Sequence, residues 1–211
     1  MFKKFAEFSP VMWGILAALV VLGAVLYLMK KSNTKWTSRL IANAALTIAL
    51  ATVLSYIRLY RMPQGGSITP ASMLPIFMFA YAYGAGPGCF VGLVFGFMQW
   101  LQDAFYMVTP VEGIMDYLLA YALLGLAGLA RKLPEQYALQ VGCVIGALGR
   151  AICAIVAGFV FFAEYAPEGQ APLVYSMVYN GLYLIPETII CVIIACFPQI
   201  RRAAKRLSLA K

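Results

Sequence analysis

Two carboxylates interrupt an otherwise apolar stretch of this chain. The segment YMVTPVEGIMDYLLAYALLGLAG, from Tyr106 to Gly128, contains Asp116 beside Tyr117, with Glu112 one helical turn earlier. The segment has no lysine or arginine that could neutralise these acids. A charge at the centre of a bilayer costs about 2.5–3.5 kcal/mol on insertion scales, so an ionisable residue there is a functional candidate by default. Two such carboxylates favour a cationic ligand.

Further polar residues lie in other apolar stretches. Arg150 is in the middle of one, while Asn180 and Glu187 are seven residues apart and share one helix face in another. Aromatic residues gather around these positions: Tyr106, Tyr117, Phe162, Tyr165, Tyr175 and Tyr179. Two interpretations stay open. Asp116 and Arg150 pair while the tyrosines anchor the membrane interface, or the carboxylate and the rings line a pocket for a flat organic cation.

A stripe of four residues suggests where such a pocket lies. Arg150, Ala154, Gly158 and Phe162 recur every four residues, so a helix presents them on one side. The small residues between the guanidinium and the ring leave a gap along that side. Close helix packing explains the same pattern, and spacing alone does not separate the two.

The amino-acid composition indicates the environment in which these residues lie. The 211 residues are 63% hydrophobic and only 11% charged, whereas a soluble domain carries about a quarter charged residues. The sequence therefore predicts an integral membrane protein, an all-α helical bundle of one compact domain, with the lipid bilayer around it. The net charge of +8 is spread over segment ends and forms no continuous basic face, which excludes a nucleic-acid partner.

The chemistry that the chain lacks is equally informative. Histidine is absent, which removes Ser-His and Cys-His catalysis and the HExxH zinc motif. The five cysteines lie in apolar runs without a CxxC pair, so neither a metal site nor a disulfide frame is expected. No set of nucleophile and base is readable, and we predict that the protein is not an enzyme.

Seven segments are candidates for membrane spans of about 20 residues. They cover about 10–30, 37–60, 70–83, 85–103, 110–130, 137–163 and 172–199, the third being the shortest. The basic tail after residue 200 predicts a cytoplasmic C-terminus, and counting back places the N-terminus outside. Arg58 and Arg61 fall on the outer side and count against this orientation. Glycines every four residues, at Gly88, Gly92 and Gly96, predict a smooth ridge for close helix packing.

Several stretches together resemble one family. YMVTPVEGIMDYLLAYALLGLAG, GRAICAIVAGFVFFAEYAPEG, YSMVYNGLYLIPE and MPQGGSITPASMLPI are similar to the thiamine-specific S component of energy-coupling factor (ECF) transporters. The resemblance implies a six-helix substrate-binding core over 37–200. It leaves residues 1–36 as an N-terminal tail with one extra transmembrane helix and a basic linker, and 201–211 as a basic cytoplasmic tail.

The resemblance also implies partners. An S component of the bacterial plasma membrane binds its vitamin from outside and joins a transmembrane coupling protein and two cytoplasmic ATPases. This chain has no P-loop, so the partners would use ATP and the chain itself would bind no cofactor. The family docks on the coupling protein through an AxxxA pattern on its first core helix, which Ala45 and Ala49 match.

The family's pocket carries over residue by residue. The positions expected to face thiamine or an analogue are Tyr106, Glu112, Asp116, Tyr117, Arg150, Ala154, Gly158, Phe162, Tyr175 and Asn180. In this resemblance Asp116 complements the ligand's positive charge and Asn180 reads the aminopyrimidine edge. Glu112 stands where a glutamine is common.

Two positions depart from the family's pattern. Ala154 replaces the usual histidine, and Phe162 replaces a tryptophan found in one branch. One lost hydrogen bond costs about 1–3 kcal/mol. The alternatives are an S component for another vitamin or a thiamine precursor such as a pyrimidine, and a stand-alone proton-coupled transporter.

Overall fold

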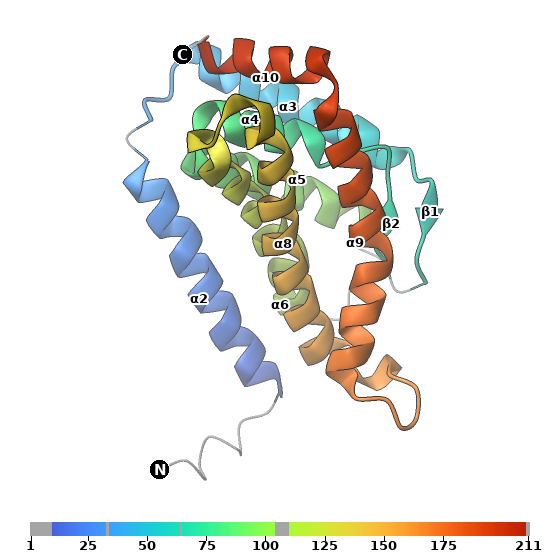
Figure 1. The fold of residues 1–211 in the computed structure, drawn as a ribbon. Helices are drawn as coiled ribbons and strands as arrows, with labels where there is room; N and C mark the ends of the chain where they lie inside the picture. Colours follow the sequence, from blue (N-terminus) through green and yellow to red (C-terminus); the bar gives the residue numbers. More distant parts are fainter. Residues whose placement is uncertain (1–9, 33, 64, 104–109, 210–211) are drawn as a thin grey trace.

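The computed structural model describes residues 10–32, 34–63, 65–103 and 110–209 as a bundle of helices with one small hairpin (Figure 1). In chain order the elements are α2 (Pro10–Lys31), α3 (Ser38–Tyr56), β1 (Tyr60–Arg61), β2 (Ser67–Ile68), α4 (Leu74–Tyr83), α5 (Ala85–Asp103), α6 (Pro110–Glu112), η2 (Gly113–Leu119), α7 (Ala120–Ala122), η3 (Leu123–Lys132), α8 (Glu135–Phe161), η4 (Ala163–Tyr165), α9 (Pro172–Cys196) and α10 (Pro198–Leu209). The two strands pair antiparallel, with Tyr60 opposite Ile68.

The predicted all-α membrane bundle is confirmed. In the described part of the chain, five helices are long and apolar enough to cross a membrane: α2, α3, the rod 113–132, α8 and α9. The predicted segment 70–83 yields only the 10-residue α4, and α5, with 19 residues, ends in polar Gln99, Gln102 and Asp103. Large apolar side chains point outward, as with Leu19 at 59% and Ile185 at 61% exposure, which suits contact with lipid.

The segment that carries the two acids is one rod with changing helical winding. A seven-residue π-helix, η2, contains Asp116 and Tyr117, and η3 winds as a 3₁₀ helix. π-helical turns are rare and are frequent at functional sites. The expected span over 110–130 is therefore present, with a wider turn at the acidic residues than a regular α-helix has.

Glycines hold this rod against its neighbours on two sides. A Cβ added to Gly92 or Gly96 of α5 would lie 2.3 Å or 2.6 Å from the carbonyl oxygens of Tyr121 and Tyr117. On the other side, a Cβ on Gly146 of α8 would lie 2.7 Å from the Leu124 carbonyl oxygen. The predicted ridge on α5 thus packs directly on the backbone that positions Asp116.

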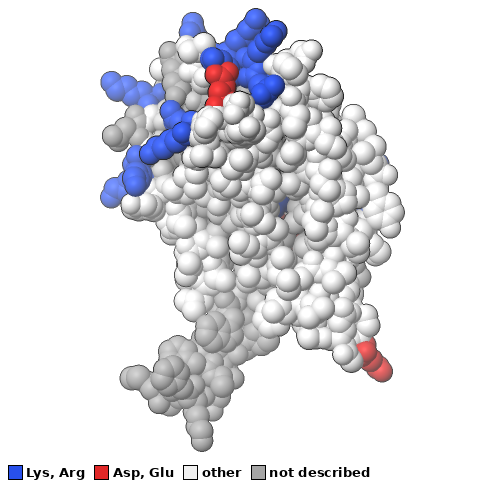
Figure 2. All heavy atoms as spheres, viewed as in Figure 1, with Lys and Arg blue, Asp and Glu red and all other residues white. Residues whose placement is uncertain are grey.

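The two ends of the bundle differ in charge. Lysines and arginines gather where α10 lies and where α2 ends (Figure 2). The helix α10 was not predicted; it buries Ala204, and Lys205 Nζ lies 2.7 Å from the Glu135 carboxylate. That carboxylate raises the pKa of the exposed Lys205 ammonium by accepting its hydrogen bond. An amphipathic helix with a basic face therefore crosses one end of the bundle.

The extra helix α2 packs on one side of the bundle. Its contacts are with α5, α8 and η2. Near its start, a Cβ on Gly14 would lie 2.8 Å from a methyl carbon of Val160; near its end, Ser32 lies against Gly86. The helix keeps a wide apolar surface, including Val20 at 67% exposure.

Candidate functional site

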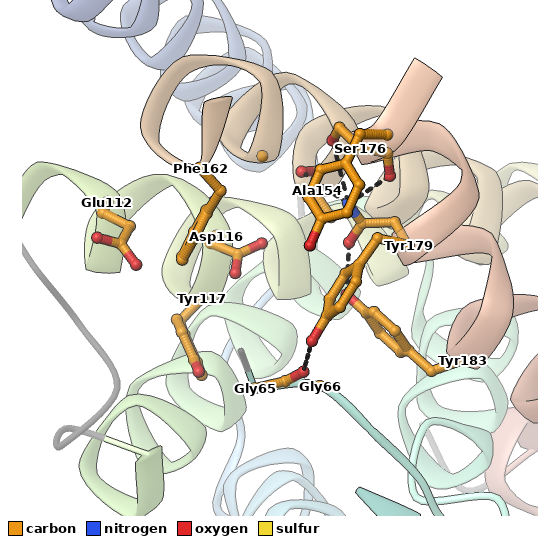
Figure 3. Close-up of a pocket in the computed structure, with 13 residues that line it drawn as sticks. Gly65, Gly66, Glu112, Asp116, Tyr117, Ala154, Phe162, Ser176, Tyr179 and Tyr183 are labelled. Atoms are coloured by element: carbon orange, nitrogen blue, oxygen red, sulfur yellow. Dashed lines mark hydrogen bonds between the residues drawn. The ribbon is translucent and has the colours of Figure 1, made fainter. Parts of the chain in front are cut away.

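A pocket lies in the half of the bundle away from α10, where α8 ends and α9 begins (Figures 1 and 3). It is lined by Gly65, Gly66, Glu112, Asp116, Tyr117, Ala154, Gly158, Phe162, Tyr175, Ser176, Tyr179, Asn180 and Tyr183. Its volume is about 40 Å³. Small-molecule pockets are typically about 300–1,000 Å³, so this narrow pocket must widen to hold a vitamin-sized ligand.

One wall comes from the π-helical turn. Asp116 is half-buried, and it lines the pocket together with Phe162 and Tyr117 (Figure 3). Glu112, on the preceding turn, is almost fully buried at 2% exposure. The carboxylates of one helical rod therefore face the same small cavity as the aromatic rings.

The opposite wall is formed by close contact of α8 with α9. A Cβ on Gly158 would lie 2.3 Å from Ser176 Oγ, so only glycine lets the helices meet here without a shift. Ser176 Oγ donates to the Ile155 carbonyl at 2.8 Å. Asn180 Nδ2 donates to the Ser176 carbonyl at 2.9 Å and reaches the Ala154 carbonyl at 3.4 Å. Tyr183 Oη donates to Asn180 Oδ1 at 2.7 Å. The amide is thus held in one orientation.

The β1–β2 hairpin covers the pocket. Tyr179 Oη donates to the Gly65 carbonyl at 2.9 Å, as the dashed line in Figure 3 marks. Gly66 has φ +78°, and a Cβ there would lie 2.8 Å from the Tyr183 ring. Such a left-handed conformation favours glycine. The turn of the hairpin therefore rests on the tyrosines of α9.

Two arginines tie the base of the hairpin to α5. Arg58 Nη2 and Arg61 Nη2 lie 2.9 Å and 3.2 Å from the same oxygen of Asp103. One carboxylate therefore serves both arginines. The ion pairs also connect the covering hairpin to the bundle.

Beneath the pocket, Arg150 takes part in a buried network. Its Nη1 lies 3.6 Å from Glu187 Oε2, and its Nη2 donates to Tyr121 Oη at 2.7 Å. Glu187 accepts further hydrogen bonds from the hydroxyls of Thr69 and Ser72, which precede α4. The acid that pairs with this arginine is therefore Glu187, and the suggested Asp116–Arg150 pair is not the one formed.

The structure brings eight of the ten predicted ligand-facing residues to one pocket: Glu112, Asp116, Tyr117, Ala154, Gly158, Phe162, Tyr175 and Asn180. Arg150 lies outside its lining, and Tyr106 lies outside the described residues. Sequence reasoning also named Tyr179 among the rings of a possible pocket, but it missed Gly65, Gly66, Ser176 and Tyr183 as lining residues. Helical spacing could have found Ser176 and Tyr183, which share the face of Asn180 and Glu187.

Comparison with known proteins gives consistent matches. The family described as Thiamine transporter protein (Thia_YuaJ) matches residues 41–207. Thiamine transporter ThiT of Bacillus subtilis is 33% identical over 178 residues, which cover 78% of this chain and 92% of that protein. Thiamine transporter ThiT of Lacticaseibacillus paracasei is 26% identical over 172 residues, covering 73% and 83%.

A solved structure shows the same fold. ThiT from Listeria monocytogenes superposes with a TM-score of 0.69 at 24% identity, over 80% of this chain and 96% of that chain. Both the match of residues 41–207 and the 33% identity span most of the chain. The chain belongs to the Thiamine transporter protein family.

Proposed function

We propose that this protein captures thiamine, or a close analogue, from outside the cell and hands it to an ATP-driven ECF complex. The observation that carries this proposal is Asp116. No ion pair or hydrogen bond joins its side chain to any part of the chain that the structure describes, although it lies among aromatic rings in a membrane protein. A carboxylate in such a setting requires a cation, which a bound ligand would supply.

Two other acids in this half of the bundle, Asp103 and Glu187, support this assignment by contrast. Asp103 pairs with Arg58 and Arg61, and Glu187 pairs with Arg150. The described arginines of this half of the bundle are therefore used by other carboxylates. A ligand with a permanent positive charge on a flat ring complements Asp116 electrostatically.

The rings around Asp116 suit the same ligand. Phe162 and Tyr117 line the pocket with the carboxylate, and Tyr175 and Tyr179 form a tilted pair with ring centroids 5.9 Å apart on α9. Aromatic faces attract cations by about 0.5–2 kcal/mol each. Asn180 would read the polar edge of the ligand through the second lone pair of its Oδ1.

Binding requires that the pocket widen from about 40 Å³. We expect the turn of the hairpin to move, because the Tyr179–Gly65 hydrogen bond and the packing of Gly66 on Tyr183 connect it to α9, while the ion pairs to Asp103 keep its base in place. After capture, the hairpin would close over the ligand and exclude water.

Delivery across the membrane would involve partners. The basic end would face the cytoplasm, and the pocket would open at the other side. Ala45 and Ala49 are exposed on α3, while α2 packs against α5, α8 and η2. The extra helix therefore leaves the proposed AxxxA docking face accessible to a coupling protein, with two ATPases supplying the energy.

The decisive experiment is a calorimetric titration of the purified protein with thiamine. Asp116→Asn keeps the shape of the side chain and removes its charge, so binding should weaken roughly 10–100-fold, the equivalent of about 1.4–2.8 kcal/mol. The matched control is Glu168→Gln, which makes the same charge change on an exposed loop and should bind as the wild type does. Unchanged affinity in Asp116→Asn would refute the assigned role.

A second candidate ligand class is favoured by Ala154. Its methyl group lines the pocket where the family's resemblance implies an imidazole, so one ring and one hydrogen bond to the ligand are missing there. A competition series with thiamine, hydroxymethylpyrimidine and the thiazole moiety distinguishes the two. If hydroxymethylpyrimidine alone displaces bound thiamine at equal concentration, the precursor is the better assignment.

A further inference from the structure

A large cavity lies at the basic end of the bundle, between the extra helix and the core. Its volume is about 770 Å³, far larger than that of the pocket described above. Its walls come from the end of α2 and the following linker, from the α4–α5 turn and from the end of η3. The extra helix is therefore one wall of a space that the six core helices alone do not enclose.

The charge of this cavity has one sign. Lys31, Lys35, Arg131 and Lys132 line it, and no aspartate or glutamate is among its lining residues. In the described residues, the arginines and lysine that form ion pairs are Arg58, Arg61, Arg150 and Lys205, none of which lines this cavity. Four uncompensated cations around one space repel each other, so an anion bound between them is stabilised.

The backbone and hydroxyl groups of the cavity suit an oxyanion. Ser32 and Thr34 share a hydrogen bond of 2.7 Å between their hydroxyls, and both line the cavity. A Cβ on Gly84, which has φ +99°, would lie 2.9 Å from Arg131 Nη1, so the guanidinium lies against bare backbone. The helices α3 and α5 begin at this wall, and helix N-termini favour negative charge.

The rim of the cavity is apolar. Leu28 and Leu129 line it, and Leu129 is 52% exposed on a membrane-embedded rod. A soluble anion gains nothing from such a rim, whereas an acyl chain does. Basic cavities between membrane helices at the cytoplasmic side are a recurrent form of lipid headgroup site.

We propose that this cavity binds the phosphate group of an anionic phospholipid, with Lys31, Lys35, Arg131 and Lys132 around the phosphate and the acyl chains over Leu28 and Leu129. The lipid would join α2 to the core and so fix the extra helix in place. This assignment does not depend on what binds in the pocket beneath the hairpin.

The test is native mass spectrometry of the purified full chain with added phosphatidylglycerol or phosphatidylcholine. The wild type should retain phosphatidylglycerol and not phosphatidylcholine. In the variant K31Q/R131Q, retention should fall roughly 30-fold, the equivalent of about 2 kcal/mol for two basic contacts. The variant R202Q/R206Q is the matched control, because it removes two exposed charges of α10 at the same end and should keep the wild-type retention.

Three results would overturn the proposal. Equal losses in both double variants would mean general attraction to a basic surface, and equal retention of both lipids would mean that charge plays no part. Full displacement of the lipid by inorganic phosphate at physiological concentration would assign the site to a free anion. Size-exclusion profiles and unfolding temperatures without lipid, which should match the wild type, separate lost binding from misfolding.

Discussion

The contact between α8 and α9 at Gly158 provides a direct test of how the pocket is built. A Cβ at this position would lie 2.3 Å from Ser176 Oγ and 3.2 Å from Ser176 Cβ, with Asn180 Nδ2 at 3.3 Å. Gly158 has an ordinary helical backbone, so alanine fits its own helix. Any destabilisation by Gly158→Ala must therefore come from side chains of the facing helix.

The change in the free energy of unfolding caused by Gly158→Ala is the sum of three contributions. Overpacking costs about 1–3 kcal/mol, and Ser176 loses its 2.8 Å hydrogen bond to the Ile155 carbonyl, which contributes about 0.5–1.5 kcal/mol. Alanine recovers about 1 kcal/mol through its better helix propensity. The expected net destabilisation is about 1–3 kcal/mol. Thiamine affinity should fall as well, because Ser176 and Asn180 both line the pocket.

Thermal unfolding in detergent, followed by intrinsic fluorescence, measures the loss of stability. Calorimetric titration measures the loss of thiamine affinity. The double variant Gly158→Ala/Ser176→Gly removes the side chain that clashes and should recover most of the lost stability. The control is Gly181→Ala on α9, where the nearest atom to a new Cβ is Ile185 Cδ1 at 3.5 Å, an ordinary contact. Gly181→Ala should therefore unfold at or above the wild-type temperature.

Two results would contradict this account of the α8–α9 contact. If the Gly158→Ala variant unfolds at the wild-type temperature, α8 and α9 can move apart without a loss of unfolding free energy. A double variant that stays as unstable as Gly158→Ala would show that Ser176 is not the obstacle. Either result would contradict the view that one glycine sets the distance between the two helices.

Two further variants test the network and the covering hairpin. Glu187→Gln should destabilise the protein by about 3–5 kcal/mol, because the Arg150 guanidinium, 3.6 Å from this carboxylate, is left buried without its counter-ion. Unfolding in denaturant measures this destabilisation, and a decrease of less than about 1 kcal/mol in the free energy of unfolding would contradict the prediction. Tyr179→Phe removes the hydroxyl that donates to the Gly65 carbonyl, so stopped-flow binding rates should rise roughly 2–10-fold. Unchanged rates would mean that this hydrogen bond does not hold the hairpin.

Helical periodicity and charge predicted much of the bundle, and the family resemblance predicted most of the residues that line the pocket. Asp116, Gly158 and Asn180 lie on three separate segments, and each was predicted from a local pattern or from the family resemblance. The structure places all three around one cavity. Such positions are predictable because the face of a helix follows from sequence spacing alone.

The partner of Arg150 was not predictable in the same way. Asp116 and Glu187 are both carboxylates in apolar helices, and spacing gives no reason to choose between them. The choice follows from the hydroxyls of Thr69 and Ser72, which donate to Glu187 from a loop more than a hundred residues away. Because a buried ion pair is stable only when its remaining lone pairs are satisfied, these donors select Glu187.

The hairpin and α10 escaped prediction for other reasons. Gly65 and Gly66 stand in a loop without periodicity, and their packing on Tyr179 and Tyr183 exists only in three dimensions. The segment after residue 200 was predicted as a charged tail because its basic residues dominate the composition. Its helix buries only Ala204, a side chain too small to give an apolar signal.

The structure also shows which side chains surround Ala154. The missing imidazole suggested from the sequence that a ring and a hydrogen bond are absent from this part of the pocket. In the structure, Ala154 packs with Tyr183 and Met62, and Asn180 is oriented by the Tyr183 hydroxyl. We infer that Tyr183 supplies, from α9, the aromatic face and the polar group that α8 lacks. Tyr183→Phe should therefore weaken thiamine binding more than the introduction of an imidazole by Ala154→His strengthens it.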